Sequence, residues 1–91
     1  MADVDRVTRI KERLEVVFRP QDLQVGDDSH LHAGHEGAKG GGGHYNVTMV
    51  SPVFAGLSTV ERHRMIYDAL GDMMKQEIHA LSIQALSPDE I

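Results

Sequence analysis

The sequence predicts a small α+β domain, in which two helices pack on one face of a three-stranded mixed sheet. Apolar residues recur at helical spacing in two segments, and they alternate with polar residues in three others. These segments follow one another in the order helix, strand, strand, helix, strand. A chain of 91 residues can build one modest core, so residues 1–91 are expected to form a single domain.

The first helix is expected over residues 4–18, with Asp3 as its N-cap. Pro20 disfavours helical conformation at the residue before it, so the helix should end there. The apolar positions of the segment recur on one face and should pack against the sheet. They are Val7, Ile10, Leu14, Val17 and Phe18.

A hairpin with a long loop is expected next. Residues 22–27, DLQVGD, and residues 44–51, HYNVTMVS, both alternate between apolar and polar side chains. In the second strand, Tyr45, Val47 and Met49 share one face. The flexible loop between the strands covers about residues 28–43, and loops of this length are usually functional or disordered.

The second helix is expected over residues 59–77, where Ile66, Ala69, Leu70 and Met73 share one face. Ser58 and Glu61 form a capping box at its start. Gly71 should weaken this helix only slightly.

The last strand is expected over residues 79–86, with the second helix as the crossover from the second strand. If the two strands are parallel neighbours, this crossover should be right-handed. Leu81, Ile83 and Ala85 alternate on one face, and His79 has the same parity at the junction between helix and strand. Residues 87–91 should form a short tail.

The composition excludes several kinds of site. The chain has no cysteine, so it can supply no disulfide, thiol nucleophile or thiolate ligand. Its formal net charge of −5 disfavours nucleic acid, because lysine and arginine dominate affinity for phosphate backbones. The sequence has neither a long apolar run nor the apolar segment of a secretory signal. We therefore expect a cytoplasmic protein that does not enter a membrane.

The segment from His30 to His44 holds four of the six histidines and six of the nine glycines. His30, His32 and His35 have the spacing H-x-H-x-x-H, and neutral imidazole binds zinc, nickel, copper and iron. A structural metal site usually needs four ligands in fixed geometry, so flexible glycines disfavour a closed site within this chain. A phosphate-binding loop is excluded because the segment leads into a strand and not into a helix. A polar loop without chemistry is the simplest interpretation of this composition.

One small basic surface is the best nucleic-acid feature of the chain. Arg62 and Arg64 are expected to lie near Arg9, Lys11 or Lys75. The candidate residues for binding a partner or nucleic acid are Arg62, His63, Arg64 and Lys75. For His63 a packed, hydrogen-bonded histidine is the favoured interpretation over a ligand, because apolar residues neighbour it on the helix. No catalytic motif is present, so we do not expect an enzyme.

Several ordered motifs together resemble the BolA family. They cover the chain from about residue 6 to residue 88. They read FRPQDLQV, DDSHLHAGH, GGGHYNVTMVSPVFAGLSTVERHRMIYDAL and EIHALSIQA. The resemblance implies a KH-like (class II) fold of the order α-β-β-α-β, which agrees with the elements above. Many relatives have serine and glutamate where this chain has glycines before His44.

The resemblance also implies a role in iron–sulfur chemistry. BolA-like proteins are partners of monothiol glutaredoxins, and the heterodimer shares a 2Fe-2S cluster whose thiolates come from a glutaredoxin cysteine and glutathione. By motif, His79 takes the part of the family's C-terminal histidine ligand. His35 is the best match for a second ligand in the loop, and His32 is the competing assignment. The isolated chain is expected to be a monomer without cofactor.

The family implies an alternative as well. Some members are described as regulators of transcription and of the stress response that bind DNA through a surface like a helix-turn-helix. The segment STVERHRMIYDAL would be the element concerned. Because the net charge is −5, we rank this function second. If the protein is eukaryotic, the mitochondrial matrix is an alternative to the cytoplasm.

Overall fold

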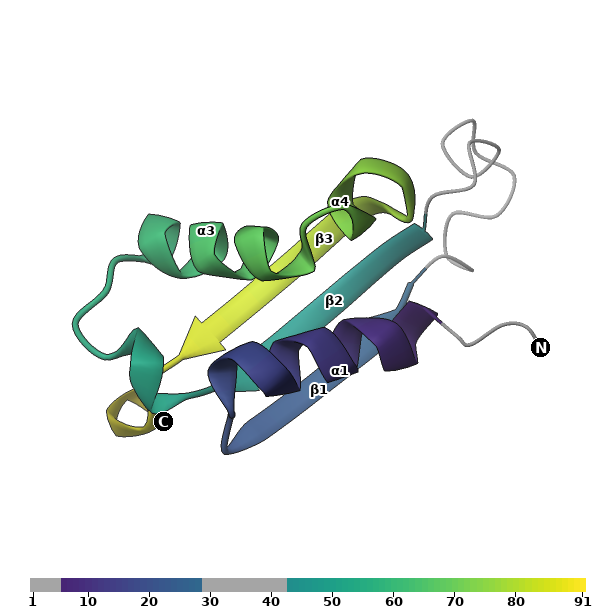
Figure 1. Ribbon diagram of the computed structural model, residues 1–91. Helices are drawn as coiled ribbons and strands as arrows, with labels where there is room; N and C mark the ends of the chain where they lie inside the picture. The colour runs from purple at the N-terminus through teal and green to yellow at the C-terminus, as the bar shows by residue number, and fades with distance from the viewer. Residues whose placement is uncertain (1–5, 29–42) are drawn as a thin grey trace.

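The computed structural model describes residues 6–28 and 43–91, which form three strands with helices on one face of the sheet (Figure 1). The strands lie in the order β1-β2-β3, with β1 antiparallel to β2 and β2 parallel to β3. The predicted α+β fold and the mixed sheet are therefore confirmed. The elements are α1 (Arg6–Phe18), β1 (Asp22–Asp27), β2 (Gly43–Val50), η2 (Pro52–Phe54), α3 (Thr59–Leu70), α4 (Met73–Gln76), β3 (Ile78–Leu86) and η3 (Pro88–Glu90).

The core lies between the helices and the covered face of the sheet. The central strand β2 contributes Tyr45, Val47 and Met49, all buried as their alternation predicts. The rings of Phe18 and Phe54 meet with their centroids 5.3 Å apart and close the core beside η2. The helices complete the cluster with Ile10, Leu14, Ile66, Leu70 and Met73. None of the helices in the described residues is both long and apolar enough to cross a membrane.

The capping box predicted at the start of α3 is confirmed. The Glu61 amide donates to Ser58 Oγ, and the Ser58 amide donates to the Glu61 carboxylate. These bonds satisfy two amides at the helix start. The bond from the Ser58 amide is the main reason why the pKa of the Glu61 carboxyl is lowered. The predicted N-cap Asp3 lies outside the described residues.

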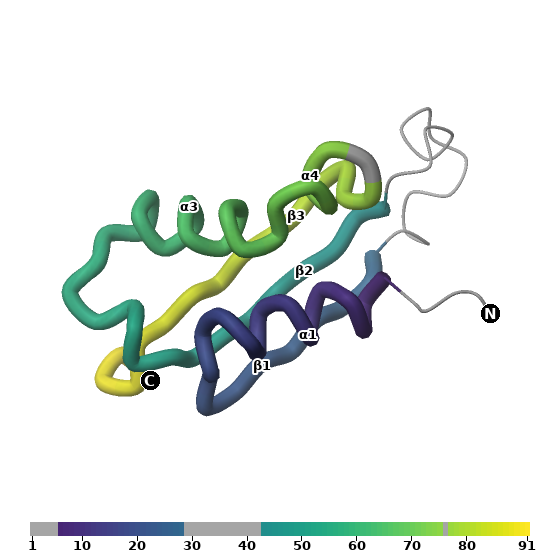
Figure 2. The backbone as a smooth tube through the Cα atoms, viewed as in Figure 1, coloured from purple at the N-terminus to yellow at the C-terminus, as the bar shows by residue number. Residues whose placement is uncertain are grey.

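Two expectations about the helices are wrong. Val17 is 54% exposed, because the buried positions of α1 follow one another at intervals of four residues, Ile10, Leu14 and Phe18, and Val17 lies outside this row. The single helix predicted over residues 59–77 is divided at Gly71, whose φ of 51° and ψ of −120° end α3. The chain then resumes as the short helix α4, which leads it back to the sheet (Figure 2).

The segment expected to be a short tail is ordered by a buried arginine. Arg62 donates to both carboxylate oxygens of Glu90, at 2.6 and 2.9 Å. The same guanidinium donates to the carbonyl oxygens of Ala85 and Leu57, at 2.9 and 3.0 Å. These bonds fasten η3 against the end of β3 and the start of α3, at the end of the sheet marked by the C-terminus (Figure 1).

Candidate functional site

Two histidines from neighbouring strands meet at the opposite end of the sheet. The ring centroids of His44 and His79 lie 5.1 Å apart, and the ring planes are inclined by 47°. His44 is half-buried near the start of β2, and His79 is exposed near the start of β3. Because β2 and β3 are parallel, both strands begin at the same end, beside α4 (Figures 1 and 2).

A β-bulge presents His79 to this site. Gly43 pairs with Ile78, but the next residue, His44, pairs with Ala80, so that His79 is the extra residue. Ile78 is buried, whereas His79 and Ala80 are both exposed. The parity expected from the sequence, which grouped His79 with buried positions of β3, is therefore wrong at this residue. Bulges commonly redirect a side chain next to a functional site.

The other neighbour of His44 is the end of β1. The Asp28 amide donates to the His44 carbonyl oxygen at 2.7 Å. The Asn46 side-chain amide donates to the Asp28 carboxylate at 2.8 Å. Gly26 pairs with Asn46, and a Cβ at Gly26 would lie 2.7 Å from the Asn46 side chain. Glycine at position 26 thus leaves room for the Asn46 side chain to bond Asp28. This bond holds the end of β1 against His44.

The N-terminal turns of α1 support the same end of the sheet through an ion pair. Arg9 donates two bonds to the Glu77 carboxylate, and Arg6 approaches one of its oxygens at 3.7 Å. The hydrogen bond from Arg9 is the main reason why the pKa of the Glu77 carboxyl is lowered. The same bond raises the pKa of Arg9. Glu77 lies two residues before His79 in the chain.

The histidine pair offers two imidazole groups, which are too few for a complete metal site. Within residues 6–28 and 43–91, no group of three or more histidine or acidic side chains is placed to hold a metal ion. Zinc in a structural site takes four ligands, and a cluster iron also needs its remaining positions filled. Further ligands must come from another part of this chain or from a partner. The predicted loop ligand His35, its competitor His32 and His30 lie outside the described residues.

The predicted basic surface is smaller than the sequence suggested. Arg62 is 8% exposed, and its guanidinium is bonded to Glu90, Ala85 and Leu57, so it is no part of an exposed basic face. Arg64 and Lys75 are exposed, and His63 is half-buried. Arg9 is engaged with Glu77. The hydrogen bonds to Glu90 are the main reason why the pKa of Arg62 is raised.

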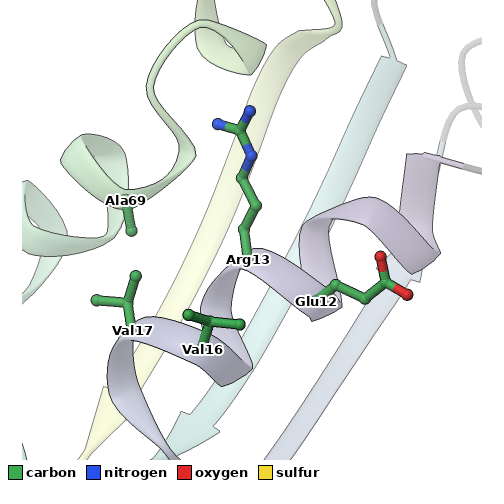
Figure 3. A pocket seen from close by; sticks show the side chains of 5 residues that line it. All are labelled: Glu12, Arg13, Val16, Val17 and Ala69. Atoms are coloured by element: carbon green, nitrogen blue, oxygen red, sulfur yellow. The ribbon is translucent and has the colours of Figure 1, made fainter.

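An open groove of about 330 Å³ lies between α1 and α3 (Figure 3). Val17 from α1 points toward Ala69 of α3, and Val16 and Arg13 lie beside it. Arg13 donates to the Leu70 carbonyl at 2.6 Å, which secures the end of α3 to α1. The groove is lined mainly by apolar side chains and presents no cluster of polar groups suited to chemistry.

Sequence reasoning overlooked His44 as a site residue, although the signal was present. The second and third predicted strands, joined by the crossover helix, both begin with histidine, at positions 44 and 79. Parallel neighbouring strands bring their first residues to the same end of the sheet. Only the exact pairing was hidden, because the bulge changes the register by one residue.

Comparison with known proteins finds one family. The family model for BolA-like protein matches residues 14–90. SufE-like protein 1 (chloroplastic/mitochondrial) of Arabidopsis thaliana is 46% identical over 91 residues, which cover 94% of this chain and 24% of that protein. The solved BolA domain of SufE1 from the same plant has a TM-score of 0.85 and 47% identity, covering 99% of this chain and 100% of the domain.

Two further relatives carry different names. Protein BOLA1 (chloroplastic) of Arabidopsis thaliana is 39% identical, over 94% of this chain and 56% of that protein. The DNA-binding transcriptional regulator BolA of Haemophilus influenzae is 31% identical, over 89% of this chain and 76% of that protein. The chain thus spans about a quarter of the first relative and just over half of the second. Both plant names refer to organelles, so the cytoplasmic location stays a prediction. Given the family-model match and these identities over most of its length, this chain belongs to the BolA-like protein family.

Proposed function

We propose that this protein is a non-enzymatic adaptor that binds a monothiol glutaredoxin and shares a 2Fe-2S cluster with it. The observation that carries the proposal is the pairing of His44 with His79, two imidazoles 5.1 Å apart at one end of the sheet. His79 is exposed, so a partner can reach it. The purpose would be the trafficking of iron–sulfur clusters or a response to iron and redox state.

The donor set fits one iron of such a cluster. Imidazole replaces thiolate on one of the two irons in Rieske centres, so two histidines from one protein are an adequate ligand pair. The other iron needs thiolates, and this chain has no cysteine. The partner must therefore supply sulfur, as a glutaredoxin cysteine and glutathione would. His79 is our first ligand and His44 our second.

The sequence comparison with the family favoured His35 for the second position, with His32 as its competitor. The geometry favours His44, because its ring already lies against that of His79. A loop histidine remains the alternative second ligand, and a variant of each residue distinguishes the two assignments. Imidazole in place of thiolate removes negative charge and raises the reduction potential. It also makes binding depend on pH, because the ligand nitrogen must be deprotonated.

A titration tests this function directly. A monothiol glutaredoxin loaded with a 2Fe-2S cluster and glutathione is mixed with increasing amounts of this protein. Visible absorption and circular dichroism are recorded for wild type, His79→Ala, His44→Ala and His35→Ala. We expect a new spectrum that is complete at a one-to-one ratio and is lost or altered in His79→Ala. A glutaredoxin spectrum that stays unchanged at every ratio would contradict the adaptor function.

The second candidate is a DNA-binding regulator, which the name of the Haemophilus influenzae relative favours. In this chain the net charge is −5, and Arg62 is engaged within the fold. Arg64 and Lys75 would have to carry the contacts. This function predicts that the isolated protein binds duplex DNA with an affinity that falls steeply with salt. The double variant Arg64→Ala/Lys75→Ala should then bind more weakly with a smaller salt slope, whereas the adaptor function predicts little binding by either protein.

A further inference from the structure

Glu77 joins α4, β2 and α1 at the point where β3 begins. Its amide donates to the Met73 carbonyl of α4 at 2.9 Å, and its own carbonyl accepts from the Gly43 amide of β2 at 3.0 Å. Arg6 of α1 donates to the same carbonyl at 3.3 Å. The next residue begins β3. The backbone is thus held on both sides at the point where the chain enters the strand that carries His79.

The side chain of Glu77 is held as firmly as its backbone. Arg9 Nη2 lies 2.5 Å from Oε2, and Arg9 Nη1 lies 2.5 Å from Oε1. A two-pronged bond between arginine and carboxylate fixes direction as well as charge. Because Arg9 lies on α1, the pair ties the entry of β3 to a helix that is packed on the sheet through Ile10 and Leu14.

These contacts define where the bulge must fall. The Glu77–Gly43 bond places Ile78 opposite Gly43, and His44 pairs with Ala80. Two residues on β2 therefore face three residues on β3, and the extra one is His79. If the entry of β3 were free to slip by one residue, the extra residue could move out of the strand. A slip of one residue also turns side chains to the other face of a sheet.

We propose that Arg9 and Glu77 are a positioning pair, which sets the bulge at His79 and so holds its imidazole beside that of His44. This inference rests on the proposed function, because it assigns the pair a part in presenting both imidazoles to iron. Arg9 and Glu77 bond to each other, and Glu77 is joined to β2 through its backbone carbonyl. Their effect acts through the backbone between Glu77 and Ala80.

The ring contact can be measured in the isolated chain by nuclear magnetic resonance. Wild type should show a nuclear Overhauser cross-peak between the imidazole protons of His44 and His79. In Arg9→Met and Glu77→Gln we expect this cross-peak to be lost or strongly reduced while the backbone amide spectrum stays folded. The matched control is Glu90→Gln, which breaks another arginine–glutamate pair, at the far end of β3. The control should keep the cross-peak.

The result that would overturn the inference is an unchanged cross-peak in both Arg9→Met and Glu77→Gln. An equal loss in Glu90→Gln would also overturn it, because the effect would then reflect general loosening of the fold. This readout contains no cluster and no partner, so it decides the positioning role even if the proposed function is wrong.

The consequence for iron is measured separately. Residues that orient metal ligands typically contribute about 10–100-fold to metal affinity. We therefore expect Arg9→Met to require at least about tenfold more protein than wild type to reach half-conversion of a cluster-loaded glutaredoxin. If wild type produces no conversion, the proposed function fails while the ring contact still stands. If wild type and Arg9→Met convert equally, positioning has no part in cluster sharing.

Discussion

The rings of His44 and His79 lie 5.1 Å apart because two parallel strands begin at the same end of the sheet and one of them carries a bulge. Parallel pairing alone would bring the strand starts together. The bulge adds the residue that presents His79 on the exposed side. Under the proposed function, this pair of imidazoles is the part of an iron site that a partner completes.

Replacing His44 by alanine should alter the spectrum formed with cluster-loaded glutaredoxin, because one of two nitrogen ligands is removed. His35→Ala tests the loop assignment in the same titration. The matched control is His63→Ala, a half-buried histidine on α3 that should leave the spectrum unchanged. A His44→Ala spectrum identical to wild type, together with an altered His35→Ala spectrum, would return the second ligand to the loop.

Acid should weaken the fold through the pair of Arg62 and Glu90. The hydrogen bonds from Arg62, and then that from the Ser87 amide, lower the pKa of the Glu90 carboxyl from 4.5 to about 2. A group whose pKa is lower in the folded state stabilises the fold fully above its unfolded value and loses that effect as the pH falls through its folded value. Thermal unfolding followed by circular dichroism should therefore show a decreasing midpoint between pH 4.5 and about 2.

The variant Glu90→Gln isolates this contribution. It should have a lower midpoint than wild type at pH 7, and the difference between the two proteins should shrink as the pH approaches 2. Equal differences at pH 7 and pH 2 would show that the ionised carboxylate has no special part in holding η3.

The core and the groove make opposite predictions for two residues of α1. Leu14 is fully buried, so Leu14→Ala should lower the free energy of unfolding by about 2–5 kcal/mol. Val17 is 54% exposed, and Val17→Ala should change it by less than about 0.5 kcal/mol. Urea denaturation measures both. Comparable losses in the two variants would place Val17 in the core, as the helical spacing had suggested.

Gly71 is expected to be needed for the break between α3 and α4. Its φ of 51° with ψ of −120° is strained for a residue with a Cβ, so Gly71→Ala should lower the free energy of unfolding by about 1–3 kcal/mol. Urea denaturation with Asp68→Ala, an exposed change in the last turn of α3, provides the control at less than about 0.5 kcal/mol. A stable Gly71→Ala protein would indicate that the two helices can join without cost.

The sheet was the most predictable part of the molecule, because its signals are local. The alternation of Tyr45, Val47 and Met49 and the capping box of Ser58 and Glu61 both appear in the structure as expected. Val17 differed because helical spacing shows which residues share a broad face and not which of them the neighbouring elements cover. The break at Gly71 was not expected, because a glycine by itself weakens a helix only slightly. Here Gly71 adopts a positive φ, which ends the helix.

The site was less predictable, because its geometry depends on distant pairings. The bulge at His79 results from contacts between residues 9, 43 and 77, which no local pattern reveals. Arg62 resembled a surface residue because its partner Glu90 lies 28 positions along the chain. The role of His79 came from family resemblance, and neither it nor the loop assignment of His35 is tested by the described residues.

Electron–nuclear double resonance tests the central claim most directly. The protein is labelled with ¹⁵N only in histidine, bound to unlabelled cluster-loaded glutaredoxin and reduced. We predict two strongly coupled ¹⁵N nuclei, one of which disappears in His79→Ala and the other in His44→Ala. The absence of any ¹⁵N coupling from this chain would contradict the claim that its histidines bind iron.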